Sequence, residues 1–169
     1  SDYLTQGPKI NKFESVFAQF CNSKYACVVS NGTAALHLCA MALGIKPGDK
    51  IITTPNTFVA SANGFRYQGA EITFCDIHPQ TFLMDLDKLE TILKTSPKGT
   101  YKAVVPVDFA GYPIDGESVK QLIEIQNVLF VVGANLATDT TVSNMQKKLP
   151  CTDEDVAFLE RAIDKMDEE

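Results

Sequence analysis

The sequence predicts an α/β fold, a three-layer sandwich in which helices cover a mostly parallel sheet. Short apolar runs alternate along the chain with segments whose apolar residues recur at helical spacing. Small polar residues, glycine and proline occupy the connections between them. Strands separated by helices of this length form βαβ units with right-handed crossovers, which is the connection used by parallel sheets.

Each expected element follows from its own local pattern. After the extended lead-in that ends at Gly7-Pro8, apolar residues at helical spacing predict an amphipathic helix over 9–20. The helix expected over 34–43 has almost no polar face and is therefore expected inside the domain. Asp85 is the expected cap of a later helix, and Thr57 of another. The further expected helices span 34–43, 58–67, 85–94 and 115–126. The expected strands span 25–29, 50–53, 71–76, 102–107 and 128–132.

Composition restricts the class of protein. The chain has 169 residues, which suggests one domain, with 45% hydrophobic and 21% charged residues. A net charge of −6 argues against nucleic acid or an acidic membrane surface as a partner. No apolar run approaches the length of a membrane span. We therefore expect a cytoplasmic protein without a membrane segment.

The five cysteines show no metal-ligand spacing, so no metal site is predicted. Three of them, Cys27, Cys39 and Cys75, fall inside apolar runs and are expected to be buried small hydrophobes. An odd number of cysteines without a signal sequence is typical of a reducing compartment.

The ligand site is expected at one edge of the sheet. Ligands of parallel α/β sheets bind beyond the carboxyl ends of the strands. Four connections fall there, at 30–33, 53–58, 76–78 and 108–111. The first leads into the helix that contains His37 and consists of small residues. Two interpretations stay open at this point: a cup of backbone N–H groups that holds a phosphate, or an ordinary strand-to-helix turn with Ser30 or Asn31 as N-cap.

Several segments resemble successive blocks of the DegT/StrS family of sugar-nucleotide aminotransferases. They are LTQGPKINKFE, VVSNGTAALHLCAMALGIKPGDKIITTPNTFVASAN, GAEITFCDI and AVVPVDFAGYPID, and they run from about Leu4 to Asp115. The resemblance implies a partial large domain of fold type I, pyridoxal 5'-phosphate as cofactor and a homodimer. It also implies a role in amino-sugar or polysaccharide biosynthesis, in which glutamate gives an amino group to a nucleotide-linked keto-sugar.

The resemblance also assigns cofactor-binding residues. Gly32, Thr33 and Ala34 match the phosphate loop of the family, and Phe58 matches the aromatic residue that stacks on the pyridine ring. A core aromatic is the competing interpretation of Phe58. Asn63 matches the family pattern as well, although it could be a structural polar group.

Three more residues are candidates for the site. Asp76 matches the family pattern but could equally be a structural polar group at a strand end. His37 is expected to be a satisfied core histidine rather than a catalyst. His78 lies in a loop beside a proline and indicates little.

The second half of the chain departs from the family pattern. Asp108 stands where the family has a histidine, and Ala134 and Ala137 stand where it has the pyridine-nitrogen aspartate and a histidine. The segment with the Schiff-base lysine is not recognisable; Lys148 has the right offset from a serine but lacks the aromatic residue and the proline. Activity of this polypeptide is therefore expected to be impaired.

The end of the chain resembles the last helix of the family, with Thr152 as N-cap. This predicts a partial large domain over 1–136, a polar connection over 137–150 in place of a missing middle, and the family's last helix over 151–169. A degenerate gene, a truncation and an incompletely traced chain would all give this pattern. An inactive relative that serves as a binding or interaction module is the alternative function. An unrelated phosphate-binding α/β domain is a third.

Overall fold

The computed structural model describes residues 7–124 and 128–130. These residues belong to two compact units. Residues 7–30 lie in the first unit, and the residues from Asn31 onward lie in the second. The predicted features around Ala134, Ala137 and Lys148, and the expected last helix, lie outside the described residues.

In the first unit, α1 (Pro8–Phe20) confirms the predicted amphipathic helix to within one residue. Gly7 is its N-cap and Pro8 its first residue, a position where proline's missing N–H is not needed. Phe13 and Phe17 stack one turn apart, with ring centroids 5.6 Å from each other.

The expected buried strand over 25–29 is wrong. These residues form no strand, and Tyr25 and Val28 are 77% and 41% exposed. An extended segment becomes a strand only when a neighbouring strand pairs with its backbone. Here the N–H of Val28 instead donates to the side chain of Glu14, at 2.8 Å. Cys27 is exposed, so its expected burial is wrong for the same reason.

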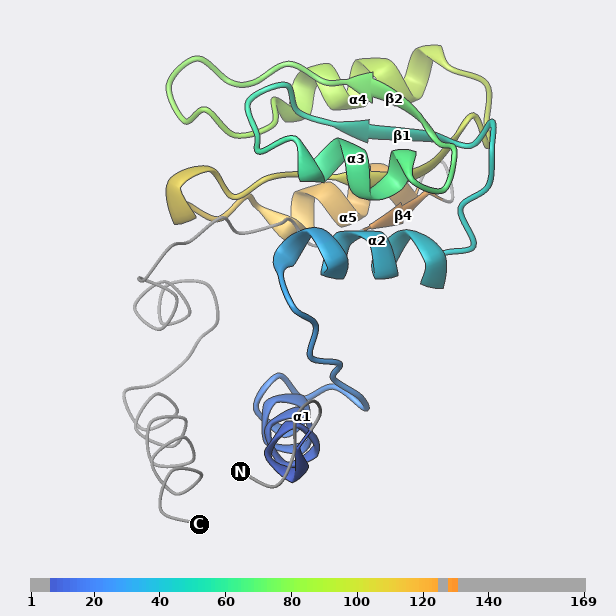
Figure 1. Ribbon diagram of the computed structural model, residues 1–169. Helices are drawn as coiled ribbons and strands as arrows, with labels where there is room; N and C mark the ends of the chain where they lie inside the picture. The colour runs from blue at the N-terminus through green and yellow to red at the C-terminus, as the bar shows by residue number, and fades with distance from the viewer. Residues whose placement is uncertain (1–6, 125–127, 131–169) are drawn as a thin grey trace. The chain divides into compact units, whose positions relative to one another are not determined.

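The second unit is built on a parallel sheet with the strand order β2-β1-β3-β4 (Figure 1). Ile51 in the central strand β1 pairs with Ile72 on one side and Ala103 on the other. Each described strand begins within one residue of its predicted start, because apolar residues flanked by turn signals are a local signal. The strands are β1 (Lys50–Thr53), β2 (Glu71–Phe74), β3 (Tyr101–Val105) and β4 (Leu129–Phe130).

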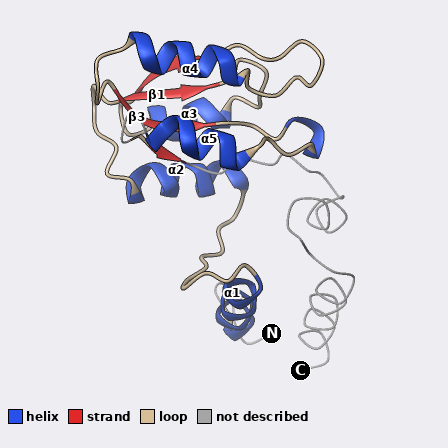
Figure 2. Cartoon of the chain, turned by 180° about the vertical axis from the view of Figure 1, so that it is seen from behind, coloured by secondary structure: helices blue, strands red, loops and turns tan. Residues whose placement is uncertain are grey.

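Two pairs of helices cover opposite faces of this sheet (Figures 1 and 2). Side chains alternate along β1: Ile51 packs into a core with α2 and α3, and Ile52 packs into a core with α4 and α5. The result is the predicted three-layer α/β arrangement. The helices are α2 (Gly32–Ala42), α3 (Ala60–Arg66), α4 (Leu86–Thr95) and α5 (Gly116–Glu124).

The helices α2 and α3 approach each other closely at Gly64. A Cβ atom at this position would lie 2.8 Å from the Cβ of Leu36 and 3.1 Å from its carbonyl carbon. Only glycine therefore allows the observed packing. The opposite face of α2 is uncovered in the described structure: Leu38 is 41% exposed and Met41 52%. Cys39 is exposed on the same helix, which corrects its expected burial, whereas Cys75 is buried as predicted.

Helix starts differ in how well they were predicted. The Asp85 carboxylate accepts the backbone N–H groups of Asp87 and Lys88, which confirms it as the cap of α4. In contrast, α3 begins two residues later than expected, and Thr57 does not cap it. Its hydroxyl lies 2.8 Å from that of Ser61 instead.

Within residues 7–124 and 128–130, no helix is both long enough and apolar enough to cross a membrane.

Candidate functional site

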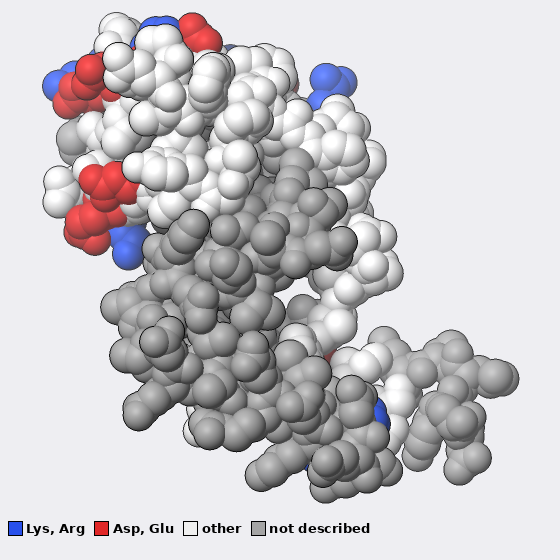
Figure 3. Space-filling view, turned by 90° about the vertical axis from the view of Figure 1, so that its left-hand side faces the viewer, with Lys and Arg blue, Asp and Glu red and all other residues white. Residues whose placement is uncertain are grey.

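The connections at the carboxyl ends of the strands meet at one edge of the second unit. Figure 1 shows the beginnings of α2, α3, α4 and α5 at the edge where β1, β2 and β3 end. The predicted segments at 53–58, 76–78 and 108–111 lie there, together with residues 31–33 of the predicted segment 30–33. Figure 3 looks onto this side; its described surface is largely uncharged, and most of the acidic and basic side chains in view lie toward the margins. The connections 54–59, 75–85 and 106–115 contain no lysine or arginine.

The beginning of α2 confirms the N-cap interpretation, and the phosphate cup stays a prediction. Asn31 is the N-cap: its Oδ1 atom accepts the N–H of Ala34 at 2.9 Å, and its carbonyl accepts the N–H of Ala35 at 3.2 Å. Helix geometry leaves the N–H groups of Gly32 and Thr33 without an acceptor inside the helix. A Cβ atom at Gly32 would find nothing within 4 Å. Two backbone donors and the Thr33 hydroxyl therefore stand at the positive end of a helix.

Phe58 lies at a pocket of about 460 Å³ on the same edge. The ring is 51% exposed, which does not support the competing interpretation of a core aromatic. A volume of this size matches the small-molecule sites of other proteins. Asn63 is half-buried on α3. The lining comes from the connections after β1 and β3 and consists of Asn56, Thr57, Phe58, Val107, Asp108, Phe109 and Ala110.

Asp108 is the one charged residue in this lining, and it is only 6% exposed. Its Oδ1 atom accepts the backbone N–H of Ile114 at 2.9 Å. Between them lies a short 3-10 turn, η1 (Phe109–Gly111). The sequence singled out Asp108 only as a departure from the family pattern. Its position before a Gly-Tyr-Pro turn was the available signal for a loop-closing carboxylate.

Asp76 is a surface residue in an ion pair. Its carboxylate lies 2.7 Å from the ammonium of Lys88 on α4 and also accepts the N–H of Ile77. The hydrogen bonds from Lys88 and Ile77 hold the pKa of Asp76 below its ordinary value, and the hydrogen bond to Asp76 raises the pKa of Lys88. Both side chains are about half exposed or more, so the pair is screened by solvent. This geometry favours the structural interpretation of Asp76.

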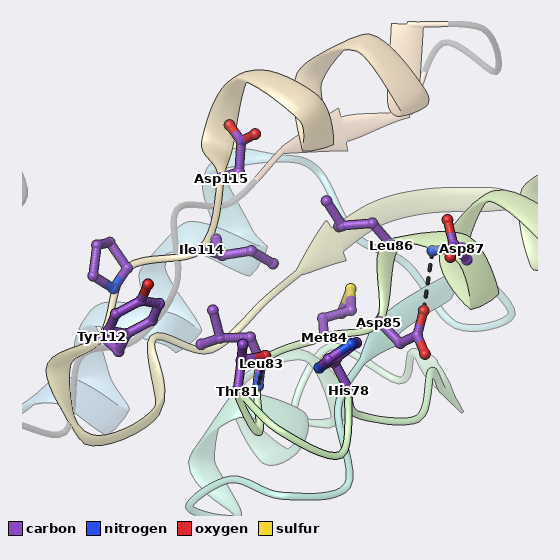
Figure 4. Close-up of a pocket in the computed structure, with 11 residues that line it drawn as sticks. His78, Thr81, Leu83, Met84, Asp85, Leu86, Asp87, Tyr112, Ile114 and Asp115 are labelled. Carbon is purple, nitrogen blue, oxygen red and sulfur yellow. Dashed lines mark hydrogen bonds between the residues drawn. The ribbon is translucent and has the colours of Figure 1, made fainter.

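A second pocket, of about 360 Å³, lies beside the connection after β3 (Figure 4). Its floor is apolar, and Asp85 and Asp115 on its margin cap α4 and α5. The hydrogen bond from Ser118 lowers the pKa of Asp115. Sequence analysis missed this pocket, because it joins two connections that are distant in the chain. The lining is His78, Thr81, Leu83, Met84, Asp85, Leu86, Asp87, Tyr112, Pro113, Ile114 and Asp115.

His37 and Cys75 have local surroundings that leave them structural roles. His37 Nε2 lies 2.6 Å from the side-chain amide nitrogen of Gln68, and its ring meets the edge of Tyr67, which agrees with a satisfied structural histidine. Burial raises the pKa of the Cys75 thiol to about 11, so it stays protonated and unreactive near neutral pH. In the described ranges, no group of three His, Cys, Asp or Glu side chains is placed to hold a metal ion.

Comparison with known proteins gives a consistent result. The model of the DegT/DnrJ/EryC1/StrS aminotransferase family matches residues 1–157. The spore coat polysaccharide biosynthesis protein SpsC of Bacillus subtilis is 39% identical over 141 residues, which is 83% of this chain and 35% of that protein. The GDP-perosamine synthase of Caulobacter vibrioides is 38% identical over 135 residues, covering 80% of this chain and 35% of the synthase.

Solved structures agree with this family and with its cofactor. The PLP form of the putative sugar aminotransferase Spr1654 from Streptococcus pneumoniae superposes with a TM-score of 0.68 at 28% identity. The superposition covers 85% of this chain and 35% of that one. A PMP form of the same protein matches equally well. This chain therefore spans about a third of the length of the relatives that it matches.

Proposed function

Because this chain belongs to the DegT/DnrJ/EryC1/StrS aminotransferase family, we propose that it provides the cofactor-binding part of a sugar-nucleotide aminotransferase. In this reaction glutamate is the amino donor and a nucleotide-linked keto-sugar is the acceptor. The observation that carries the proposal is the open start of α2, on the same edge of the sheet as the Phe58 pocket. The names of SpsC and GDP-perosamine synthase support a sugar as the acceptor.

Pyridoxal 5'-phosphate is the cofactor of this family, and the residues at the edge of the sheet fit its two ends. Its phosphate needs hydrogen-bond donors, and Gly32 and Thr33 supply N–H groups at the positive end of α2. The open space at Gly32 leaves room for a phosphate to approach the backbone. Its flat ring needs an apolar surface, which the exposed ring of Phe58 provides.

Each residue then has a physical task. Gly32 and Thr33 bind the phosphate, while Ala34 gives its N–H to Asn31 and so fixes the helix start. Phe58 covers one face of the ring and excludes water from it. Asn63, on α3, is a polar group available to contact the cofactor. When bound, the cofactor supplies the electron sink that amino-group transfer requires.

The described connections 54–59, 75–85 and 106–115 contain no lysine, the residue type that carries a proton between donor and acceptor carbons in the family. No lysine lines the Phe58 pocket, and Lys148 lies outside the described residues. We therefore propose that this polypeptide by itself has little or no transaminase activity. An inactive relative that acts as a binding or interaction module is the alternative, and the exposed apolar face of α2 favours it.

Cofactor titration followed by borohydride reduction and mass spectrometry of the intact chain separates these proposals. We expect a saturable change in cofactor absorbance without a covalent adduct. A reduced adduct on Lys148, together with release of 2-oxoglutarate from glutamate at an ordinary enzymatic rate, would contradict the proposed inactivity. Absence of any saturable binding would contradict the cofactor role itself.

A further inference from the structure

The connection after β3 forms a wall between the two pockets. Val107, Asp108, Phe109 and Ala110 face the pocket that contains Phe58. A few residues later, 112–115 face the second pocket, where Figure 4 shows Tyr112 and Ile114 opposite Leu83 and His78. One short loop therefore shapes both cavities, and its conformation decides where the rings of Phe109 and Tyr112 lie.

The backbone of this loop is strained, so other contacts are needed to maintain its conformation. Ala110 has a φ of 51°, in the left-handed region that disfavours side chains, and Gly111 follows with a φ of 78°. Two short-range bonds close the turn: Gly111 N–H donates to Asp108 O at 3.1 Å, and Tyr112 N–H to Phe109 O at 3.0 Å. Such a conformation persists only when surrounding contacts over-determine it.

Two contacts hold the loop from outside the turn. The carboxylate of Asp108 spans its whole length to accept the N–H of Ile114 at 2.9 Å. A hydrogen bond whose acceptor is only 6% exposed is stronger than the same bond in water. On the other side, the ring of Phe109 contacts that of Phe82 in the connection after β2, with centroids 6.0 Å apart.

We propose that Asp108 is a positioning residue: through Ile114 it locks the loop 108–114 and thereby sets the shape of the Phe58 pocket for the cofactor ring. The proposal rests on the proposed function for the identity of the ligand, but the lock itself does not. The hydrogen bond to Ile114 needs only an acceptor oxygen, so asparagine at this position can replace aspartate in that bond.

The experiment measures two properties of the full chain in the same variants. Hydrogen exchange of the Ile114 amide, followed by NMR, reports whether the hydrogen bond to Asp108 is intact. Titration with pyridoxal 5'-phosphate reports the cofactor affinity of the Phe58 pocket. Asp108→Ala removes the acceptor and Ile114→Pro removes the donor, so both break the same bond from opposite ends. Asp108→Asn keeps an acceptor oxygen. Asp49→Ala is the matched control, because Asp49 makes the same kind of bond, to the N–H of Lys46 at 2.8 Å, in a turn before β1.

We expect exchange at Ile114 to become at least about tenfold faster in Asp108→Ala, and cofactor affinity to fall about tenfold in both Asp108→Ala and Ile114→Pro. Asp108→Asn should restore both values to within about threefold, and Asp49→Ala should change neither. If Asp108→Ala does not fold, Ile114→Pro carries the affinity measurement.

Different results overturn different statements. Unchanged Ile114 exchange in Asp108→Ala overturns the lock, and failure of Asp108→Asn to restore affinity overturns the role of the acceptor oxygen. If the unaltered chain binds no cofactor, the proposed function fails. In that case faster Ile114 exchange in Asp108→Ala, restored in Asp108→Asn, still supports the lock.

Discussion

The two faces of the sheet are finished in different ways. On one face, α4 and α5 bury Leu89, Leu93, Val119 and Ile123, turn charged residues outward and are capped by aspartates. On the other face, α2 is capped by a neutral asparagine and exposes Leu38 and Met41. Helices α4 and α5 therefore present a polar surface to water. Helix α2 is apolar on nearly all sides, as its sequence indicates, and its outer face is exposed in the described structure.

The substitution with the largest expected effect disrupts the packing between α2 and α3. Gly64→Val places a branched side chain where even a Cβ atom would lie 2.8 Å from Leu36. We expect the free energy of unfolding to fall by about 3 kcal/mol, at the upper end of overpacking effects. Gly116→Ala, at the start of α5 where a Cβ atom meets nothing within 4 Å, is the control and should change stability by less than about 1 kcal/mol. Urea unfolding midpoints measure both. Equal stability of Gly64→Val and the unaltered chain would contradict the packing described for α2 and α3.

The next effect concerns assembly. We propose that the exposed face of α2 mediates self-association, as expected for a homodimer. Replacing Leu38 and Met41 together by lysine should weaken the dimer by more than about tenfold in sedimentation, because each change removes apolar surface and adds charge. Thr91→Lys on the exposed side of α4 is the matched control and should have no effect. An unaltered chain that sediments as a monomer at micromolar concentration would rule this proposal out.

The smallest effect is a difference in acid sensitivity between the two faces. The Asp115 carboxylate accepts hydrogen bonds from Ser118 and Glu117, which lower its pKa, so its stabilisation of α5 is complete above its unfolded pKa. This stabilisation is lost as the pH falls below about 4, through the lowered folded value. Asn31 does not titrate, so the start of α2 has no equivalent loss. Hydrogen exchange between pH 7 and pH 3 should show the first turn of α5 opening before that of α2. The reverse order would contradict the assignment of Asp115 as a cap.

Local patterns predicted the sheet and most helices because each of those elements carries its own signal. Lys50–Thr53 was predicted with its bounds, and Asp85 was identified as a cap from its position before an apolar repeat. The segment 25–29 has the composition of a strand, but pairing depends on a partner elsewhere in the chain, which composition does not reveal. Cys39 was misjudged similarly, because burial of a helix face depends on what covers it.

The candidate site was predictable in part. The rule that ligands lie beyond the carboxyl ends of parallel strands placed Phe58 correctly, after β1. Gly32 and Thr33 lie on the same edge, although the strand expected before them at 25–29 does not form. The bond from Asp108 to Ile114 was not predictable, since it depends on a left-handed residue, Ala110, that no propensity favours. The second pocket joins connections that are adjacent only after β1, β2 and β3 have paired.

The most direct test of the proposed cofactor site compares two glycines in equivalent positions. Gly32 is the first residue of α2 and Gly116 the first residue of α5, and a Cβ atom at either meets nothing within 4 Å. Valine at either position should therefore leave the fold intact, as near-identical urea midpoints would show. In a pyridoxal 5'-phosphate titration followed by absorbance, we expect Gly32→Val to lose at least about tenfold in affinity, because a branched side chain blocks approach of the phosphate to the backbone. Gly116→Val should bind as the unaltered chain does. Equal affinity of the two variants would contradict the account.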